Sequence, residues 1–208
     1  MSTKIKLCGM SRIEDIKAVN ELKPDYIGFV FFAKSIRNVT PKKAAELKAA
    51  LDPAIRVMGV FVDSPVEFVA GLQNAGTIDI AQLHGHEDND YIAKLKSLTG
   101  GKPVLQAFKA KEQADVLRAM QSDADELLLD SGMGSGECFD WSLTAASERP
   151  FFLAGGLTPE NVTAALEQIK PYAVDVSSGI ETDKLKDINK MRAFVENVRA
   201  FNARSERS

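Results

Sequence analysis

The sequence predicts an α/β protein, a single (β/α)8 TIM barrel spanning residues 1–208. Three observations lead to this fold. Short apolar runs of strand length alternate with longer segments of helical period along the whole chain. Eight such strand–helix units fit into 208 residues without a linker or a shift in composition. With 45% apolar residues, a chain of this length is able to bury one sizeable core.

The eight predicted strands are rich in Val, Ile, Leu and Phe and carry few charges, which is typical of strands covered on both faces. In chain order they are Ile5–Cys8, Tyr26–Phe31, Arg56–Phe61, Ile80–Leu83, Val104–Phe108, Leu127–Asp130, Phe151–Ala154 and Ala173–Val176. An open doubly wound sheet is the alternative, but it usually has fewer strands and a glycine fingerprint after the first. The first turn here, Cys8-Gly9-Met10-Ser11, is not that fingerprint, so the barrel is favoured.

Amphipathic segments between the strands predict the helices, and several begin with recognisable start signals. The predicted helices are Arg12–Leu22, Lys42–Leu51, Val66–Ala75, Asp90–Leu98, Glu112–Met120, Glu160–Ile169 and Asp187–Phe201. The start signals are a capping box of Ser11 with Glu14, Thr40-Pro41, Ser64-Pro65 with Glu67, and Thr158-Pro159. The sixth unit is the weakest, because Asp140–Ala146 leaves room for only a short helix.

Composition and charge exclude several classes of protein. A net charge of −3 argues against a general nucleic-acid binder. No apolar run approaches the ~20 residues of a membrane span. Two cysteines, Cys8 and Cys138, in a chain without a signal segment predict a reduced, cytoplasmic protein. A monomer and a homodimer both stay open.

Two turns of small residues follow the last two predicted strands. The first contains Gly155-Gly156, and the second reads Ser177-Ser178-Gly179. Glycine lets the backbone approach a ligand closely, serine adds a hydroxyl donor, and a following helix N-terminus offers unpaired N–H groups. Either turn alone would most simply be an ordinary one. Together, after strands seven and eight of a barrel, they favour a phosphate site.

Cys8 and Asp130 end the first and sixth predicted strands, where barrels carry their active-site residues. Cys8 is either a small buried apolar residue or a base whose pKa is lowered by a nearby positive group or helix N-terminus. Asp130 follows three leucines, and partial burial would raise its pKa and make it a general acid. The pair would approach one substrate from different strands.

The evidence for each of the other candidate site residues, in the loops after the predicted strands, is weaker when it is taken alone. Arg37 suits bidentate recognition of a carboxylate, although a loop arginine is often merely solvated. His84 is either a polar core residue or a ligand-binding one, and His86 is expected on the surface. Only two histidines, two positions apart, make a metal site unexpected. The glycine-rich stretch 131–137 fits a mobile lid better than a plain linker, and Cys138 is expected to be a bystander.

Several segments, taken in order, resemble the phosphoribosylanthranilate isomerase family. They are Lys6-Leu7-Cys8-Gly9-Met10, Gly28-Phe29-Val30-Phe31 with Ser35-Ile36-Arg37, Gly59-Val60-Phe61-Val62, Gln82-Leu83-His84-Gly85, Leu129-Asp130 with Gly134-Ser135-Gly136 and Phe139-Asp140-Trp141, Leu153-Ala154-Gly155-Gly156-Leu157 with Pro159-Glu160-Asn161-Val162, and Val174-Asp175-Val176-Ser177-Ser178-Gly179-Ile180-Glu181. The sequence departs from the family pattern at Ile36, Met133 and Ser135. These changes bear on loop motion and turnover and leave the candidate reacting groups in place.

The resemblance implies a cofactor-free Amadori rearrangement of N-(5-phosphoribosyl)anthranilate in tryptophan biosynthesis. It implies that Asp130 protonates the furanose ring oxygen and that Cys8 then removes the C2′ proton. Arg37 would hold the anthranilate carboxylate. The phosphate of this small-molecule substrate would lie on the two small-residue turns. His84, which follows strand four, and Asp175, which lies within strand eight, complete the predicted substrate-binding set.

Three other functions remain open at this point. A phosphosugar epimerase on the same barrel would usually need a metal held by several histidines and carboxylates. The related histidine-pathway isomerase resembles the phosphate half but has aspartate where Cys8 stands, so dual specificity is disfavoured. A non-catalytic module that binds a phosphorylated ligand would keep both turns, and the presence of both Cys8 and Asp130 argues against it.

Overall fold

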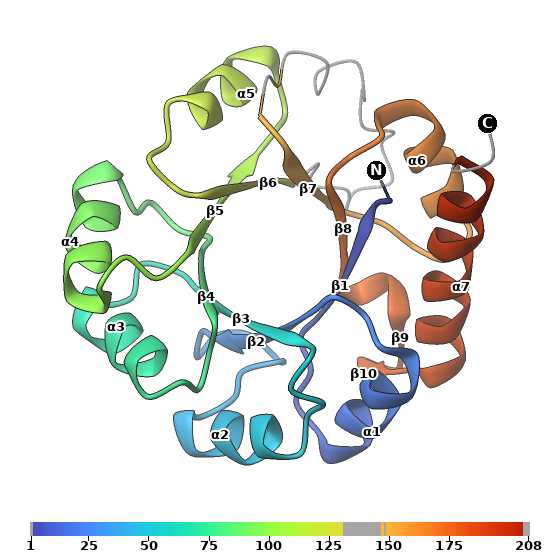
Figure 1. The fold of residues 1–208 in the computed structure, drawn as a ribbon, viewed down its shortest axis with the longest axis horizontal. Coiled ribbons are helices and arrows are strands. Elements are labelled where there is room, and N and C mark those ends of the chain that lie inside the picture. Colours follow the sequence, from blue (N-terminus) through green and yellow to red (C-terminus); the bar gives the residue numbers. More distant parts are fainter. Residues whose placement is uncertain (1, 131–146, 148, 206–208) are drawn as a thin grey trace.

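A computed structural model describes residues 2–130, 147 and 149–205. Eight parallel strands form a closed barrel in sequence order (Figure 1), which confirms the predicted (β/α)8 fold. The strands are β1 (Lys4–Cys8), β2 (Tyr26–Phe31), β3 (Arg56–Phe61), β4 (Ile80–Leu83), β5 (Val104–Lys109), β6 (Glu126–Asp130), β7 (Phe151–Ala154) and β8 (Ala173–Val176).

Helices form a ring around the barrel (Figure 1). They are α1 (Ile13–Leu22), α2 (Pro41–Ala49), α3 (Val66–Asn74), α4 (Asn89–Thr99), α5 (Gln113–Met120), α6 (Val162–Ile169) and α7 (Ile188–Ser205). The predicted short helix Asp140–Ala146, the predicted lid and Cys138 lie outside the described residues. None of the helices described here is long and apolar enough to cross a membrane.

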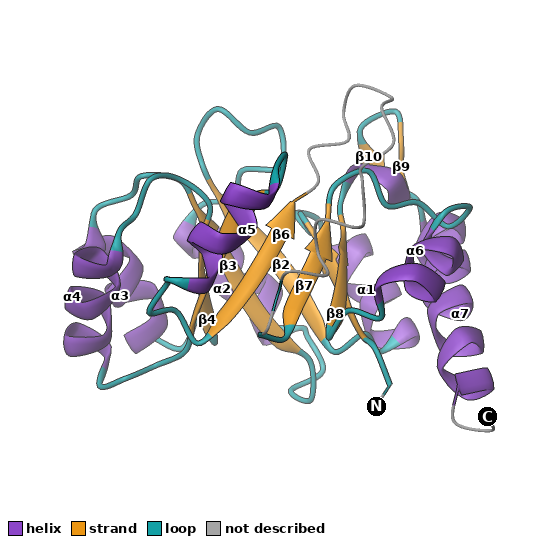
Figure 2. Cartoon of the chain, turned by 90° about the horizontal axis from the view of Figure 1, so that it is seen from above, coloured by secondary structure: helices purple, strands orange, loops and turns teal. Residues whose placement is uncertain are grey.

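The segment after β8 contains elements that the sequence did not predict. A single 3-10 turn, Ser178–Ile180, leads into a hairpin of two short strands, β9 (Glu181–Thr182) and β10 (Leu185–Lys186). Figure 2 shows this hairpin at the end of the barrel opposite the N-terminus. It therefore lies at the carboxyl ends of the barrel strands, where active sites of this fold are built.

The predicted capping box at the first helix is wrong in its residues. Helix α1 begins at Ile13 with Arg12 as its N-cap, and Asp15 takes the role assigned to Glu14. The Asp15 carboxylate accepts hydrogen bonds from the backbone N–H groups of Ser11 and Arg12, at 2.9 and 3.0 Å. Its ion pair with the Arg12 guanidinium, at 2.7 Å, fixes this geometry.

The other start signals have mixed outcomes. Thr40 caps α2 as predicted, because its hydroxyl accepts a 3.2 Å hydrogen bond from the N–H of Lys43. Ser64 does not cap α3, whose N-cap is Pro65 without a side-chain hydrogen bond. Helix α6 begins at Val162, later than expected, because the chain from Thr158 first forms a turn closed by Asn161.

Strand alternation divides the side chains between two environments. One set faces the helices and forms the main apolar core, with Leu7 and Ile27 fully buried there. The other set faces the barrel axis, where Tyr26, Met58 and Phe152 fill the end near the N-terminus. The same inward faces continue toward the other end of the barrel, and there the side chains become polar.

Candidate active site

A cavity of about 390 Å³ opens at the carboxyl ends of the strands. Its lining residues are Cys8, Val30, Ser35, Arg37, Val60, Gln82, His84, Asp130, Ala154, Gly155, Gly156, Leu157, Asp175, Ser177 and Ser178. The cavity thus brings together every predicted site residue except Gly179. A larger hollow of about 730 Å³ lies at the opposite end, beside the starts of β3 and β5, and contains no predicted site residue.

Cys8 ends β1 and is a buried free thiol. Its neighbour in the register is Gly28 of β2, where a Cβ atom would lie only 2.6 Å from the Cys8 sulfur. Glycine at position 28 therefore makes room for the thiol. Burial raises the pKa of Cys8, and this effect outweighs the opposing influence of the nearby Lys6 and Lys186 ammonium groups. The expected positive groups are present, but the thiol is still the favoured form near neutrality.

A buried ion pair lies beside Cys8. The Lys6 side chain is fully buried, and its Nζ is 2.6 Å from Oδ2 of Asp175. Burial works to lower the pKa of Lys6, but Asp175 and Cys8 reverse that effect and raise it. The other carboxylate oxygen of Asp175, Oδ1, is buried and has no hydrogen-bond partner among the described residues. Asp175 therefore brings an unused acceptor to the cavity.

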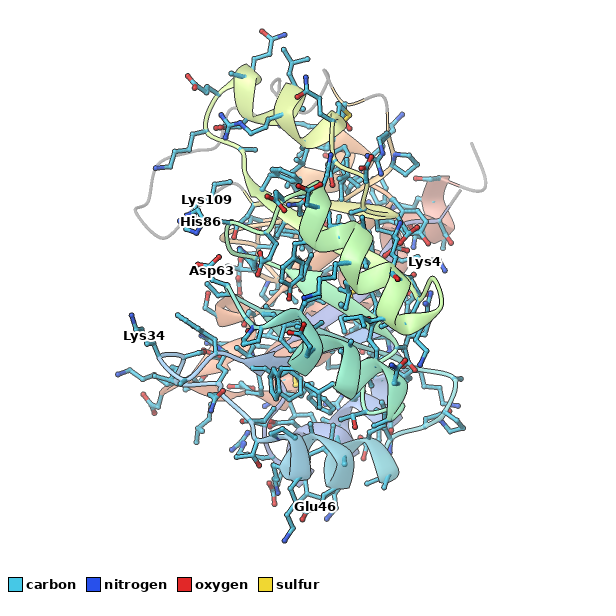
Figure 3. The ribbon with its side chains drawn as sticks, turned by 90° about the vertical axis from the view of Figure 1, so that its left-hand side faces the viewer. Lys4, Lys34, Glu46, Asp63, His86 and Lys109 are labelled. Atoms are coloured by element: carbon cyan, nitrogen blue, oxygen red, sulfur yellow. The ribbon has the colours of Figure 1, made fainter. Side chains whose placement is uncertain are left out.

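Asp130 and His84 form a second polar pair in the cavity. His84 Nε2 lies 3.5 Å from Asp130 Oδ2, and both side chains are about one-quarter exposed. On its other side, His84 Nδ1 is 3.5 Å from the Gln82 amide nitrogen. His84 is thus a cavity residue rather than a core residue. By contrast, His86 is on the surface beside Asp63, as expected (Figure 3).

Arg37 reaches the cavity from the loop after β2 and is held by a carboxylate that is not among the predicted site residues. Its Nε and Nη2 donate to the two oxygens of Glu181, both at 2.6 Å. Lys186 donates to the same carboxylate at 2.7 Å and to the Ser177 carbonyl at 2.9 Å. Burial alone would raise the pKa of Glu181, but Arg37 and Lys186 hold it below its usual value. The hairpin β9–β10 therefore fixes the position of Arg37.

The two small-residue turns pack against each other. Gly155 and Gly156 have positive φ angles of 94° and 61°, a conformation that residues with a side chain rarely adopt. A Cβ on Gly179 would lie 1.9 Å from the carbonyl oxygen of Leu157. Gly179 thus allows the second turn to approach the first, although it does not itself line the cavity. The Ser177 hydroxyl joins this turn to β1 by donating to the Cys8 carbonyl at 3.2 Å.

The chemistry available in this cavity is proton transfer. A thiol and a carboxylic group enter from β1 and β6, and no cluster of three or more His, Cys, Asp or Glu suited to a metal ion occurs within residues 2–130, 147 and 149–205. The fold and this site together define a (β/α)8-barrel enzyme with acid–base groups at the barrel mouth.

Comparisons with known proteins identify the family. A sequence profile described as N-(5'phosphoribosyl)anthranilate (PRA) isomerase matches residues 5–197. The N-(5'-phosphoribosyl)anthranilate isomerase of Caldanaerobacter subterraneus subsp. tengcongensis is 42% identical over 203 residues, which cover 94% of this chain and 98% of the relative. This chain therefore belongs to the phosphoribosylanthranilate isomerase family, and the predicted identity is confirmed.

Solved structures agree with this assignment. The crystal structure of phosphoribosyl anthranilate isomerase from Thermotoga maritima matches with a TM-score of 0.87 and 33% identity, covering 95% of this chain and 99% of that one. A second structure of such an isomerase, in complex with reduced 1-(o-carboxyphenylamino)-1-deoxyribulose 5-phosphate, matches with a TM-score of 0.84 and 32% identity, over the same shares of the two chains.

Proposed function

We propose that the mouth cavity converts N-(5'-phosphoribosyl)anthranilate to 1-(2-carboxyphenylamino)-1-deoxyribulose 5-phosphate, with Asp130 as acid and Cys8 as base. The reaction itself, an Amadori rearrangement of tryptophan biosynthesis, is that of the family to which the chain belongs. The observation that carries the residue roles is that Cys8 and Asp130 line one cavity from β1 and β6. A direct assay that follows the loss of anthranilate fluorescence tests the activity.

The proton transfers follow from the two groups. Asp130 donates a proton to the furanose ring oxygen, and the ring opens to a protonated Schiff base. Cys8 then removes the proton from C2′, and the resulting enolamine tautomerises to the ketone. The positive iminium charge acidifies the C2′ proton, so a base of moderate strength suffices. Neither step requires a cofactor.

The paired turns are proposed to hold the substrate phosphate through backbone N–H groups. Ser178→Asp places a negative charge in this cradle and is expected to raise KM strongly, with a smaller change in kcat. Inorganic phosphate should compete with substrate for the wild-type enzyme and much less for the variant. Ser178→Ala is the matched control, because it removes the hydroxyl without adding charge. An unchanged KM in Ser178→Asp would reject the phosphate assignment.

Arg37 is proposed to bind the anthranilate carboxylate. A guanidinium has five N–H donors, and Glu181 uses only the edge formed by Nε and Nη2. Arg37→Ala is expected to weaken transition-state binding by roughly 2–5 kcal/mol if the new charge pair is desolvated. Lysine at this position should rescue only in part, because it lacks the planar fork. The measurement is kcat/KM, and a value near wild type in Arg37→Ala would assign the carboxylate to another group.

We further propose a cellular context for this activity. A cytoplasmic protein with a small phosphorylated substrate, and with no nucleic-acid or membrane partner, fits the slightly acidic net charge of −3. The assembly is proposed to be a monomer or a homodimer. One related crystal structure from Thermotoga maritima is described as monomers generated from a dimeric isomerase. Sedimentation at several protein concentrations distinguishes the two states.

A further inference from the structure

We propose that Lys6 is a positioning residue for the catalytic base, because its buried ammonium group, held by Asp175, faces the barrel axis on the same side of β1 as Cys8 and supplies the charge that stabilises the thiolate. The proposal rests on the proposed function in one respect, that Cys8 acts as the base.

The geometry of β1 and β8 places Lys6 between the two groups. Side chains two residues apart on a strand share a face, so Lys6 and Cys8 both face the barrel axis. Lys6 pairs in register with Asp175 of the neighbouring strand, and the Nζ–Oδ2 distance is 2.6 Å. The electrostatic influence of Cys8 adds to that of Asp175 in raising the pKa of Lys6. Lys6 is thus the link between the base and the carboxylate.

A buried lysine is costly to the fold unless its charge is well paired and hydrogen-bonded. Lys6 is fully buried, among barrel-facing residues that are mostly apolar toward the N-terminal end. An apolar side chain of similar length would fill the same space without the desolvation cost. The ion pair with Asp175 is only half satisfied, because Oδ1 of that carboxylate lacks a partner among the described residues. Packing and pairing alone therefore do not account for Lys6.

Among the described residues, the charged and titratable groups around the Cys8 thiol come from several elements. They are Lys6 in β1, Asp175 in β8, Lys186 in β10, Arg37 in the loop after β2, and Asp130 and His84 in the same cavity. Lys186 and Arg37 already share the Glu181 carboxylate, which offsets their charge. The nearby Lys6 lowers the pKa of Cys8, although burial outweighs it, and Asp175 raises that pKa.

Oδ1 of Asp175, which has no partner in the described part of the chain, suggests how the Lys6 charge becomes available to Cys8. Asp175 lines the cavity, so a substrate hydroxyl that donates to Oδ1 would spread the carboxylate charge and weaken its hold on Lys6. The ammonium would then act more fully on Cys8. Thiolate formation releases one proton to solvent, and Lys6 keeps its own protons throughout.

The test measures Cys8 ionisation directly, without substrate, in a Cys138→Ser background that leaves Cys8 as the only cysteine. The rate of alkylation by iodoacetamide and the thiolate ultraviolet absorbance are followed against pH. Loss of a neighbouring opposite charge shifts a pKa by about 1–3 units. Lys6→Met is therefore expected to move the midpoint up by about that amount, whereas Lys6→Arg moves it much less. Restricted access changes the plateau rate and not the midpoint.

Asp175→Asn is a second test, in which the Cys8 midpoint is expected to shift in the opposite direction. Removal of the carboxylate charge is expected to move the midpoint of Cys8 down, and this arm decides the question if Lys6→Met fails to fold. Lys4→Met is the matched control, because Lys4 is on the same strand but half exposed at the far end of the barrel (Figure 3). It should leave the midpoint unchanged.

Equal midpoints in the wild type, Lys6→Met and Asp175→Asn, or shifts of the same sign in both variants, would overturn the proposal. Because thiol ionisation is measured without turnover, these experiments test the role of Lys6 separately from the proposed function. Loss of activity in Cys8→Ala with no effect of Lys6 on thiol ionisation would keep Cys8 as the base and reject Lys6 as its positioning residue.

Discussion

Cys8→Ala is expected to lower kcat about 10²–10⁴-fold, because a general base contributes rate enhancement of that order. The substitution deletes only the sulfur from a site that the neighbouring glycine at position 28 already leaves open. The fold and most of the substrate affinity should therefore persist. Cys8→Ser should lose a similar factor, because a hydroxyl is far too weakly acidic to supply a base near neutrality. Steady-state kinetics with separate kcat and KM values are the measurement.

The pH dependence of kcat/KM tests whether Cys8 acts as the base. A base must be deprotonated, so kcat/KM falls as the pH drops below the pKa of the Cys8 thiol. Because burial raises that pKa, the acidic limb should lie on the high side of the ordinary thiol range in the free enzyme. The limb should vanish in Cys8→Ala, once titration of the substrate itself has been excluded. Alkylation of Cys8 should abolish turnover, and bound substrate should protect against it.

Cys138→Ser is the matched control and is expected to be nearly silent in the same assays. Full activity in Cys8→Ala would contradict the mechanism without bearing on the barrel or on the proposed phosphate site. A residual rate with an unchanged acidic limb would assign that limb to another group in the cavity.

The barrel was predictable because its strands are buried on both faces and therefore read as continuous apolar runs. Strand β4 matches its predicted range, and β1 differs by one residue at its start. The hairpin β9–β10 was not predictable, because two-residue strands carry no periodicity. This matters for the site, since the hairpin supplies the Glu181 carboxylate that holds Arg37 and the Lys186 ammonium that binds the same carboxylate.

Most of the candidate site followed from one rule, that barrel enzymes place reactive groups at the carboxyl ends of strands. That rule selected Cys8 and Asp130, and the structure brings both into the mouth cavity. It did not select Lys6, which lies two residues below the end of β1. Strand alternation placed Lys6 on the same face as Cys8, but only the β1–β8 register shows that its partner is Asp175.

Helix starts were less predictable than strands because several residues compete for the same backbone N–H groups. Ser11 and Asp15 both lie within reach of the first turn of α1, and the carboxylate, anchored by Arg12, takes the hydrogen bonds. The distinction depends on side-chain geometry, which spacing alone does not determine. It has no effect on the site, since the helix still follows β1 at the expected place.

Asp130→Asn is expected to lower kcat about 10²–10⁴-fold, because the amide keeps the shape of the side chain but cannot deliver a carboxylic proton to the ring oxygen. KM should change much less, since the proposed phosphate and carboxylate contacts do not involve Asp130. Asp63→Asn is the matched control. It makes the same substitution in the loop after β3, on a side chain that is half exposed and outside the cavity, and it should leave kcat near wild type.

His84 is the alternative proton donor, because its ring nitrogen Nε2 is only 3.5 Å from the Asp130 carboxylate. If Asp130 is the acid, His84→Gln should raise KM or lower kcat modestly and keep the shape of the pH profile. If His84 were the donor, His84→Gln would instead show the large loss in kcat and Asp130→Asn the small one. The ratio of the two kcat values therefore identifies the proton donor. We expect kcat of Asp130→Asn to be lower than that of His84→Gln by at least about tenfold, because loss of a general acid costs about 10²-fold or more and the loss in His84→Gln is modest.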